Sequence, residues 1–169
     1  MLNSNVGIWG TGNWLDPARR TEACEVAAEI EDLGYESLWL SAGFGEGMPS
    51  VFGDLLAATK HMTIASGILS IWHSTAADTT SAFNSLDQLH PGRFLLGLGA
   101  SHGRIVEALN QTYERPFSRM VNYLDELDVQ QPSVPHDRLV LAALGPRMLK
   151  LAAERSSGAH PYFVPVEYT

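Results

Sequence analysis

Residues 91–103 read PGRFLLGLGASHG, and this stretch does most to decide the fold. Its middle part, Phe94–Gly99, is a nearly continuous run of apolar and small residues, which is typical of a strand buried on both faces. A short loop follows, and residues from about 104 to 129 then favour one or two helices that break near Arg115-Pro116. A buried strand that leads through a short loop into a helix is the repeating unit of parallel α/β proteins.

The same alternation of buried strand and amphipathic helix continues on both sides of this stretch. Strands are expected at residues 5–9, 37–41, 62–70, 94–99, 139–144 and 159–164. Further helices are expected after Asp16-Pro17 as far as Leu33, and at residues 49–60, 75–89 and 146–155. Apolar strands that alternate with helices indicate a parallel sheet covered by helices. Two architectures satisfy this pattern, an open doubly wound sheet and a (β/α)₈ barrel.

In both architectures ligands bind beyond the carboxyl ends of the strands, so these ends form the candidate site. They comprise Gly10, Ser41–Phe44, Ile71–His73, Ala100–His102, Leu144–Arg147 and Tyr162–Val164. His73 and His102 lie at strand ends and are the candidate catalytic side chains, whereas His61, His90 and His136 are expected at helix ends or in loops. The histidine spacing contains no HExxH or similar motif, and we expect no metal site.

Two glycine-containing turns at these ends were compared with known ligand-binding turns. Gly97–Gly103 departs from the dinucleotide-binding fingerprint, because its third glycine comes one place late and residues 117–119 read Phe-Ser-Arg where an acidic residue is needed. Gly145-Pro146-Arg147 opens the helix expected at 146–155, where backbone N–H groups, the helix dipole and a guanidinium favour an anion. A phosphate site is one interpretation of this turn, and an ordinary strand-to-helix turn with a surface arginine is the other.

Composition restricts the class of protein. The chain has 169 residues, 45% hydrophobic and 18% charged, which is ordinary for one globular domain. Its 11 basic and 19 acidic side chains leave a net charge of −8, so neither a nucleic acid nor an anionic membrane is expected as a partner. No signal peptide or membrane span is recognised. The single cysteine, Cys24, cannot form an internal disulfide, which favours a cytoplasmic location.

Four blocks of the sequence resemble successive blocks of the luciferase-like monooxygenase superfamily. They read LGYESLWLS at residues 33–41, MTIASGILSIW at 62–72, HPGRFLLGLGASH at 90–102 and ALGPRMLKLAAERSSGAHPYF at 143–163. The similarity is closest to the branch of oxidoreductases that depend on the deazaflavin coenzyme F420. It implies a (β/α)₈ barrel, a homodimer, and a flavin or deazaflavin bound at the carboxyl ends of the strands. This resemblance, rather than the periodicity, favours the barrel over the open sheet.

Matched residue by residue, the resemblance implies a cofactor site made of Gly67, Ile68, Gly99, Ala100, Ser101, His102, Gly145, Pro146 and Arg147. Residues 67–68 match a place where the family often has a non-proline cis peptide behind the deazaflavin ring. Residues 99–102 match the strand end that lines the ring and the cofactor's side chain. Residues 145–147 match the turn that holds the cofactor phosphate. The implied chemistry is hydride transfer between the deazaflavin and a small organic substrate.

Two departures from the family pattern have consequences. The second expected strand ends in Ser41-Ala42-Gly43-Phe44, where relatives commonly carry an acidic residue or a histidine, so no proton donor or base is assigned. A whole barrel takes about 250 residues. Residues 1–169 are therefore expected to form a single barrel domain, truncated after the sixth of the usual eight strands.

Three functions follow as alternatives. The first is an F420-dependent oxidoreductase that acts on a small molecule. The second is a non-catalytic relative that binds a ligand or a partner chain, because an unclosed barrel leaves strand edges free to pair. The third is an FMN-dependent protein similar to the monooxygenases, since the matching backbone features serve flavin and deazaflavin alike.

Overall fold

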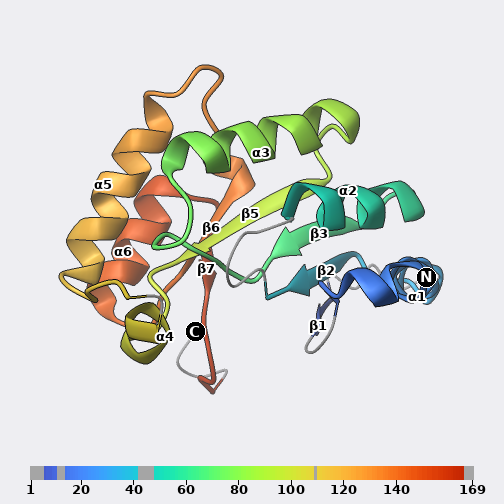
Figure 1. The fold of residues 1–169 in the computed structure, drawn as a ribbon, viewed down its shortest axis with the longest axis horizontal. Helices are drawn as coiled ribbons and strands as arrows, with labels where there is room; N and C mark the ends of the chain where they lie inside the picture. Colours follow the sequence, from blue (N-terminus) through green and yellow to red (C-terminus); the bar gives the residue numbers. More distant parts are fainter. Residues whose placement is uncertain (1–5, 11–13, 42–47, 109, 166–169) are drawn as a thin grey trace.

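The apolar stretch at residues 94–99 forms the strand β5 (Phe94–Gly99), inside a sheet in which each pair of neighbouring strands is parallel (Figure 1). The computed structural model describes residues 6–10, 14–41, 48–108 and 110–165. The other strands are β1 (Gly7–Gly10), β2 (Ser37–Leu40), β3 (Thr63–Ser66), β4 (Leu69–Ser70), β6 (Leu139–Ala142) and β7 (Ala159–His160). Their order in the sheet is β1-β2-β3-β5-β6-β7, and β4 also pairs with β5.

Helices connect these strands, close to the places that the sequence predicts. They are η1 (Pro17–Arg19), α1 (Arg20–Asp32), α2 (Met48–Ala58), α3 (Ala76–Leu89), α4 (Gly103–Ala108), α5 (Pro116–Asp128), η2 (His136–Arg138) and α6 (Pro146–Arg155). Asp16 accepts a hydrogen bond from the Ala18 N–H at 2.9 Å, and Thr75 caps α3 in the same way. Gly34, just beyond α1, has a φ of +92°, which favours glycine. Local capping chemistry therefore sets these helix boundaries.

The hydrophobic core lies between the sheet and the row of helices α1, α2, α3, α5 and α6, in which each helix packs against the next. Phe94 at the start of β5 shows how the layers meet. Its ring lies 5.2 Å from that of Phe52 in α2 and 6.0 Å from that of Phe83 in α3, measured between centroids. All three rings are buried, and they fasten the sheet to two helices at once.

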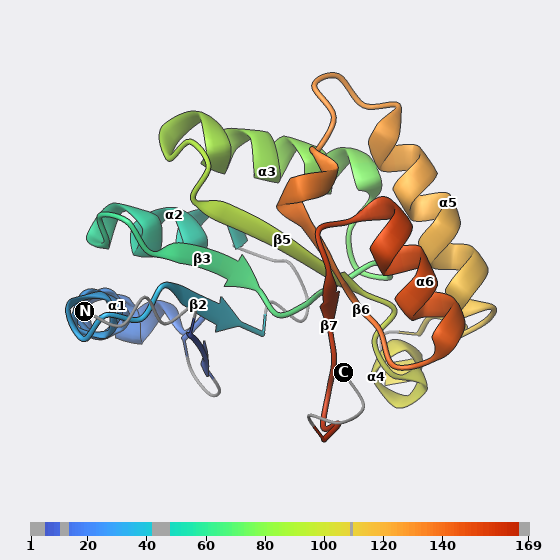
Figure 2. The same cartoon turned by 180° about the vertical axis from the view of Figure 1, so that it is seen from behind.

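The sheet curls until its two ends approach each other (Figure 2). The Trp9 ring in β1 lies 6.4 Å from the Tyr162 ring, which follows β7 at the other end of the sheet. The Trp39 ring in β2 lies 5.1 Å from the His160 ring in β7. These contacts cross the concave face of the sheet, so the chain forms a half-barrel. The expected incomplete α/β barrel with about six strands is confirmed, with β3 and β4 as two pieces of the third strand.

Two expected strands differ from the structure. Residues 62–70 form two short strands, with Gly67 and Ile68 between them, joined by a cis peptide bond as the resemblance implies. Residues 159–164 contribute only Ala159 and His160 to the sheet. The chain leaves the sheet after His160, and Phe163 adopts a left-handed φ of 51°, which an extended strand does not allow.

The connection between α2 and β3 is held at the amino end of the sheet by two charged side chains. The Glu31 carboxylate accepts hydrogen bonds from the backbone N–H groups of Lys60–Met62, at 2.6 to 3.0 Å. The Arg93 guanidinium donates to the carbonyl oxygens of Leu56 at 3.0 Å, Thr59 at 2.9 Å and Met62 at 3.1 Å. Burial alone would raise the pKa of Glu31, but the three N–H donors outweigh it and hold that pKa below its ordinary value.

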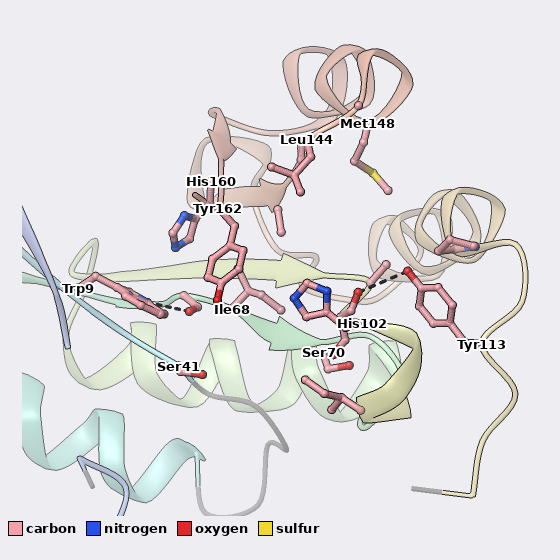
Figure 3. A pocket seen from close by; sticks show the side chains of 18 residues that line it. Trp9, Ser41, Ile68, Ser70, His102, Tyr113, Leu144, Met148, His160 and Tyr162 are labelled. Carbon is pink, nitrogen blue, oxygen red and sulfur yellow. Dashed lines mark hydrogen bonds between the residues drawn. The ribbon is translucent and has the colours of Figure 1, made fainter. Parts of the chain in front are cut away.

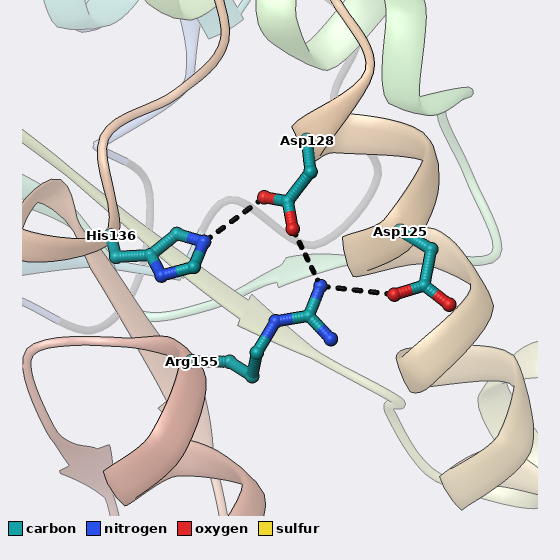
Figure 4. A network of polar contacts seen from close by, with 4 residues as sticks. All are labelled: Asp125, Asp128, His136 and Arg155. Atoms are coloured by element: carbon teal, nitrogen blue, oxygen red, sulfur yellow. Dashed lines mark hydrogen bonds and ion pairs between the residues drawn. The ribbon is translucent and has the colours of Figure 1, made fainter.

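A second polar network fastens α6 to α5 (Figure 4). Arg155 at the end of α6 donates to Asp125 at 3.0 Å and to Asp128 at 2.7 Å, both in α5. Asp128 also bonds the ring of His136 at 3.0 Å. Burial would raise the pKa of Asp128, yet His136 and Arg155 together keep it below its ordinary value. The two helices that follow β5 and β6 are thereby fixed relative to each other.

Candidate functional site

A cavity of about 490 Å³ opens at the carboxyl ends of the strands, where parallel α/β proteins bind ligands (Figure 3). Its volume lies within the range of small-molecule and cofactor sites. Its walls come from the ends of β1, β2, β4, β5, β6 and β7 and from the first turns of α4, α5 and α6. The lining residues are Trp9, Ser41, Gly67, Ile68, Ser70, Ala100, Ser101, His102, Ile105, Tyr113, Pro116, Ala142, Ala143, Leu144, Gly145, Met148, His160 and Tyr162.

Six of the residues matched by resemblance meet in this cavity. They are Gly67, Ile68, Ala100, Ser101, His102 and Gly145. The other four candidates, His73, Gly99, Pro146 and Arg147, do not line it. Three segments that are far apart in the sequence therefore converge, and none of the six residues is Asp, Glu, Lys or Arg.

The floor of the cavity is formed by Ile68, which lies against β5. A Cβ added to Gly99 would stand 2.5 Å from the Ile68 Cδ1 atom, closer than real side chains approach. Gly99 therefore lies behind the floor, where the absence of a side chain lets Ile68 pack onto the strand. Gly67 is confined in a similar way, because its Cβ would come within 2.9 Å of His160 Nε2 and 3.1 Å of Trp9 Nε1.

The loop after β5 is held by side chains from outside that strand. The Trp72 indole donates a hydrogen bond to the Ala100 carbonyl at 2.8 Å, and the Tyr113 hydroxyl donates to the Ser101 carbonyl at 3.4 Å. The Trp72 carbonyl accepts in turn from the Gln111 amide at 2.7 Å. Ser101 has a φ of 59°, a conformation that a non-glycine residue adopts only when its surroundings support it. These contacts fix the direction in which His102 leaves the strand end.

The turn at residues 145–147 divides between the cavity and the surface. Gly145 lines the cavity, and a Cβ added there would meet nothing within 4 Å. Its carbonyl accepts hydrogen bonds from Met148 and Leu149, both at 3.0 Å, and so begins α6. The Arg147 guanidinium lies 4.1 Å above the centre of the Phe117 ring and is exposed. The phosphate role expected for residues 145–147 therefore stays a prediction, with Gly145 as its part inside the cavity.

The three histidines at this end of the sheet have different surroundings. His73 lies in the turn after β4, where its backbone N–H donates to Ser70 at 3.2 Å. His102 is exposed, with its ring 5.9 Å from the Tyr162 ring. His160 lies inside the half-barrel, and burial lowers its pKa below the ordinary value although the Pro161 backbone partly opposes this shift. Burial therefore favours the uncharged form of the His160 imidazole, which is partly buried in the cavity wall.

Several lining residues escaped the sequence prediction. Trp9, within the first expected strand, was not among the candidates, but it is 43% exposed, lines the cavity and donates to the Gly67 carbonyl at 3.0 Å. Tyr113 comes from the segment between α4 and α5, where no motif marks it. His160 was expected within a strand with no role at the site. Ala42–Phe44, at the expected end of the second strand, lie outside the described residues.

The chemistry of the wall is mainly apolar. None of the eighteen described lining residues is Asp, Glu, Lys or Arg, and the polar atoms of the wall come from three serines, two histidines, two tyrosines, the Trp9 indole and the backbone. Within the same described part of the chain, no three His, Cys, Asp or Glu side chains gather as metal ligands. Such a wall suits a flat, largely apolar group that is oriented by a few hydrogen bonds.

Comparison with known proteins identifies the class. The family model described as luciferase-like monooxygenase matches residues 7–169, and the chain belongs to this family. A 5,10-methylenetetrahydromethanopterin reductase from Archaeoglobus fulgidus is 27% identical over 152 residues, covering 76% of this chain and 45% of the reductase. The family shown by the match is thus the one that the sequence blocks resemble.

Solved structures support the same fold. An F420-dependent secondary alcohol dehydrogenase, in complex with an F420-acetone adduct, aligns with a TM-score of 0.72 at 20% identity, over 92% of this chain and 57% of that one. The oxygenating constituent of a 3,6-diketocamphane monooxygenase from Pseudomonas putida, in complex with FMN, aligns with a TM-score of 0.74 at 13% identity, over 97% and 58%. The chain therefore spans about half the length of the relatives it matches. Among the described helices, none has the length and apolar character needed to cross a membrane.

Proposed function

We propose that this chain belongs to an oxidoreductase that uses the deazaflavin coenzyme F420 and transfers a hydride between it and a small organic substrate. The observation that carries the proposal is the convergence of residues 67–68, 100–102 and 145 on one cavity at the carboxyl ends of the strands. The resemblance assigns these segments to the same cofactor. Their meeting is not a consequence of sequence proximity, because more than 30 residues separate each segment from the next.

The cavity fits a deazaflavin or flavin ring in its wall chemistry. Ile68, Met148 and Tyr113 supply apolar surface, and Ser70 and Ser101 supply polar atoms for a ring edge. The open space above Gly145 leaves room at the start of α6, where a helix terminus favours a phosphate group. We infer that these residues would hold the cofactor ring and the beginning of its side chain.

When bound, the cofactor supplies the redox chemistry, by accepting or donating a hydride. The protein's part is to bind, orient and exclude water. The Trp72 and Tyr113 hydrogen bonds keep the loop at residues 100–102 in one conformation. The rings of Trp9 and Tyr162, 6.4 Å apart, form the wall of the cavity at the ends of β1 and β7.

FMN is the second candidate cofactor, favoured by the FMN complex of the structural relative from Pseudomonas putida. A flavin and a deazaflavin share the flat tricyclic shape that an apolar cavity accepts, so wall chemistry does not separate them. The remaining alternative is that this protein is a non-catalytic relative, which binds a ligand or a partner chain without turnover.

Titration of the purified protein with F420 and with FMN, followed by cofactor fluorescence, tests the proposal. We expect saturable binding of one of them on the order of tens of micromolar or tighter. Gly145→Leu should weaken it at least tenfold, because the added side chain enters open cavity space without touching the protein. Gly158→Leu is the matched control, since a Cβ on Gly158 also meets nothing within 4 Å and Gly158 lies outside the cavity wall. Failure of both cofactors to bind would overturn the proposal.

A further inference from the structure

The cavity wall gathers much of the exposed apolar surface of the described chain. Trp9 is 43% exposed, Ile105 39%, Leu144 45% and Tyr162 47%, and all four line the cavity. They come from β1, α4, the turn after β6 and the segment after β7, so only the fold brings them together. Contiguous exposed apolar surface of this kind marks a binding site, whereas single exposed side chains do not.

The aromatic part of this surface is continuous. The Tyr162 ring lies edge-on to Trp9 at 6.4 Å and 5.9 Å from the His102 ring, so it bridges the two sides of the cavity mouth (Figure 3). Behind it, the His160 ring meets Trp39 at 5.1 Å. A ligand that enters past Tyr162 therefore meets flat apolar faces first, and imidazole rings on either side of them.

Formal charge is absent from the described wall. Away from the start of α6, a carboxylate that moved into this wall would lose its hydration and find no Lys or Arg partner among the residues that line it. An ammonium group would find no Asp or Glu there either. By contrast, a carbonyl or hydroxyl oxygen is small enough to be satisfied by one imidazole, serine or tyrosine donor.

We infer that the substrate of this site is an uncharged, largely apolar molecule, such as a ketone, aldehyde or alcohol on a hydrocarbon or aromatic framework, and that organic acids are excluded. This inference rests on the proposed function, because it concerns the molecule that meets the cofactor in the same cavity. It goes further in naming the chemical class that the wall accepts.

A matched pair of probes tests the inference. The neutral ketone 2-acetylnaphthalene and the anion 2-naphthoate have nearly the same size and shape, and their binding to the purified protein at pH 7 can be measured by isothermal titration calorimetry. We expect the ketone to bind at least tenfold more tightly than the carboxylate. Equal affinity, tighter binding of 2-naphthoate, or no ketone binding up to its solubility limit would each overturn the inference.

A charge-gain variant locates the effect in this cavity. Leu144→Arg places a cation at a wall position that is 45% exposed and tolerates a long polar side chain. It should raise the affinity for 2-naphthoate at least fivefold and change that for the ketone less than threefold. Leu89→Arg, at a position that is 73% exposed and outside the cavity, should change neither affinity. An equal gain in the affinity for 2-naphthoate in both variants would mean that net charge causes the effect, and it would contradict the inference.

The two proposals fail separately. If F420 and FMN do not bind while the ketone is still preferred, the proposed cofactor is wrong and the ligand class stands. If a cofactor binds while 2-naphthoate is preferred, the substrate class is wrong and the proposed oxidoreductase stands.

Discussion

Ser66 supports the cavity floor through two hydrogen bonds to a single buried residue. Its hydroxyl donates to the Gly97 carbonyl at 2.9 Å and accepts from the Gly97 N–H at 2.8 Å. The contact lies where the β3–β5 pairing ends and the β4–β5 pairing has not yet begun. A side chain thus replaces the missing backbone partner and holds the third strand to β5 beneath Ile68.

The substitution Ser66→Ala removes both hydrogen bonds and leaves only a small change in volume. Each buried peptide group that loses its partner costs about 1–3 kcal/mol, and the second lone pair of the carbonyl lowers its share, so we expect a loss of about 2–4 kcal/mol in the free energy of unfolding. Ser70→Ala is the matched control, because Ser70 is also buried but accepts only one long bond, from the Trp72 N–H at 3.4 Å. Its loss should stay below about 1 kcal/mol.

Urea unfolding at pH 7, followed by far-ultraviolet circular dichroism and by tryptophan fluorescence, measures both variants. The midpoint should fall further for Ser66→Ala than for Ser70→Ala, with the denaturant slope unchanged. A difference of less than about 0.5 kcal/mol between the two variants would refute the role given to Ser66, since ordinary surface changes reach that size.

Three further substitutions probe the frame of the fold. Gly97→Ala should destabilise the protein by about 3 kcal/mol or more, because the added Cβ overlaps the Ser66 carbonyl. Gly53→Ala inside α2 should instead stabilise it by about 0.5–1 kcal/mol, since the added Cβ meets only Leu86, at an ordinary 3.6 Å. Thermal unfolding measures both changes, and a Gly97→Ala protein as stable as the parent would contradict the geometry. Because the folded protein lowers the pKa of Glu31, the ionised carboxylate stabilises the fold at pH values above the unfolded pKa of about 4.3. This stabilisation is lost as the pH falls through the lower pKa of the folded state. Glu31→Gln should therefore cost about 1–2 kcal/mol at pH 6, allowing for the partial exposure of the carboxylate, and much less near pH 3. If urea unfolding gives the same difference in the free energy of unfolding between parent and variant at pH 6 and pH 3, the charge of Glu31 does not stabilise the fold.

Much of the local structure could be predicted from the sequence because its causes are local. The Asp16 and Thr75 caps, the glycine after α1 and the apolar run of β5 depend on neighbours within one turn or one strand. The strand–helix alternation also placed the site at the carboxyl ends of the strands, where the cavity lies. The resemblance then selected the barrel, and the curled sheet and the family match confirm it.

The remaining features depended on contacts between distant strands, which no local pattern reports. Residues 62–70 read as one strand, but pairing with β5 splits them where Ser66 bonds Gly97. Trp9 and His160 fall inside expected strands and carry no site motif, yet the curl of the sheet brings both onto the cavity wall.

The sequence by itself determined most of the elements, their order and the end of the sheet at which the cavity opens, because hydrophobic periodicity and capping act over a few residues. Only the tertiary structure decided which candidates meet. It separated Gly145, which faces the cavity, from Arg147, which lies on Phe117, two positions further along the chain. The described cavity wall likewise exists only because the curl of the sheet brings side chains of β1 and β2 close to those at and after β7, and that curl depends on the summed twist and packing of all the strands.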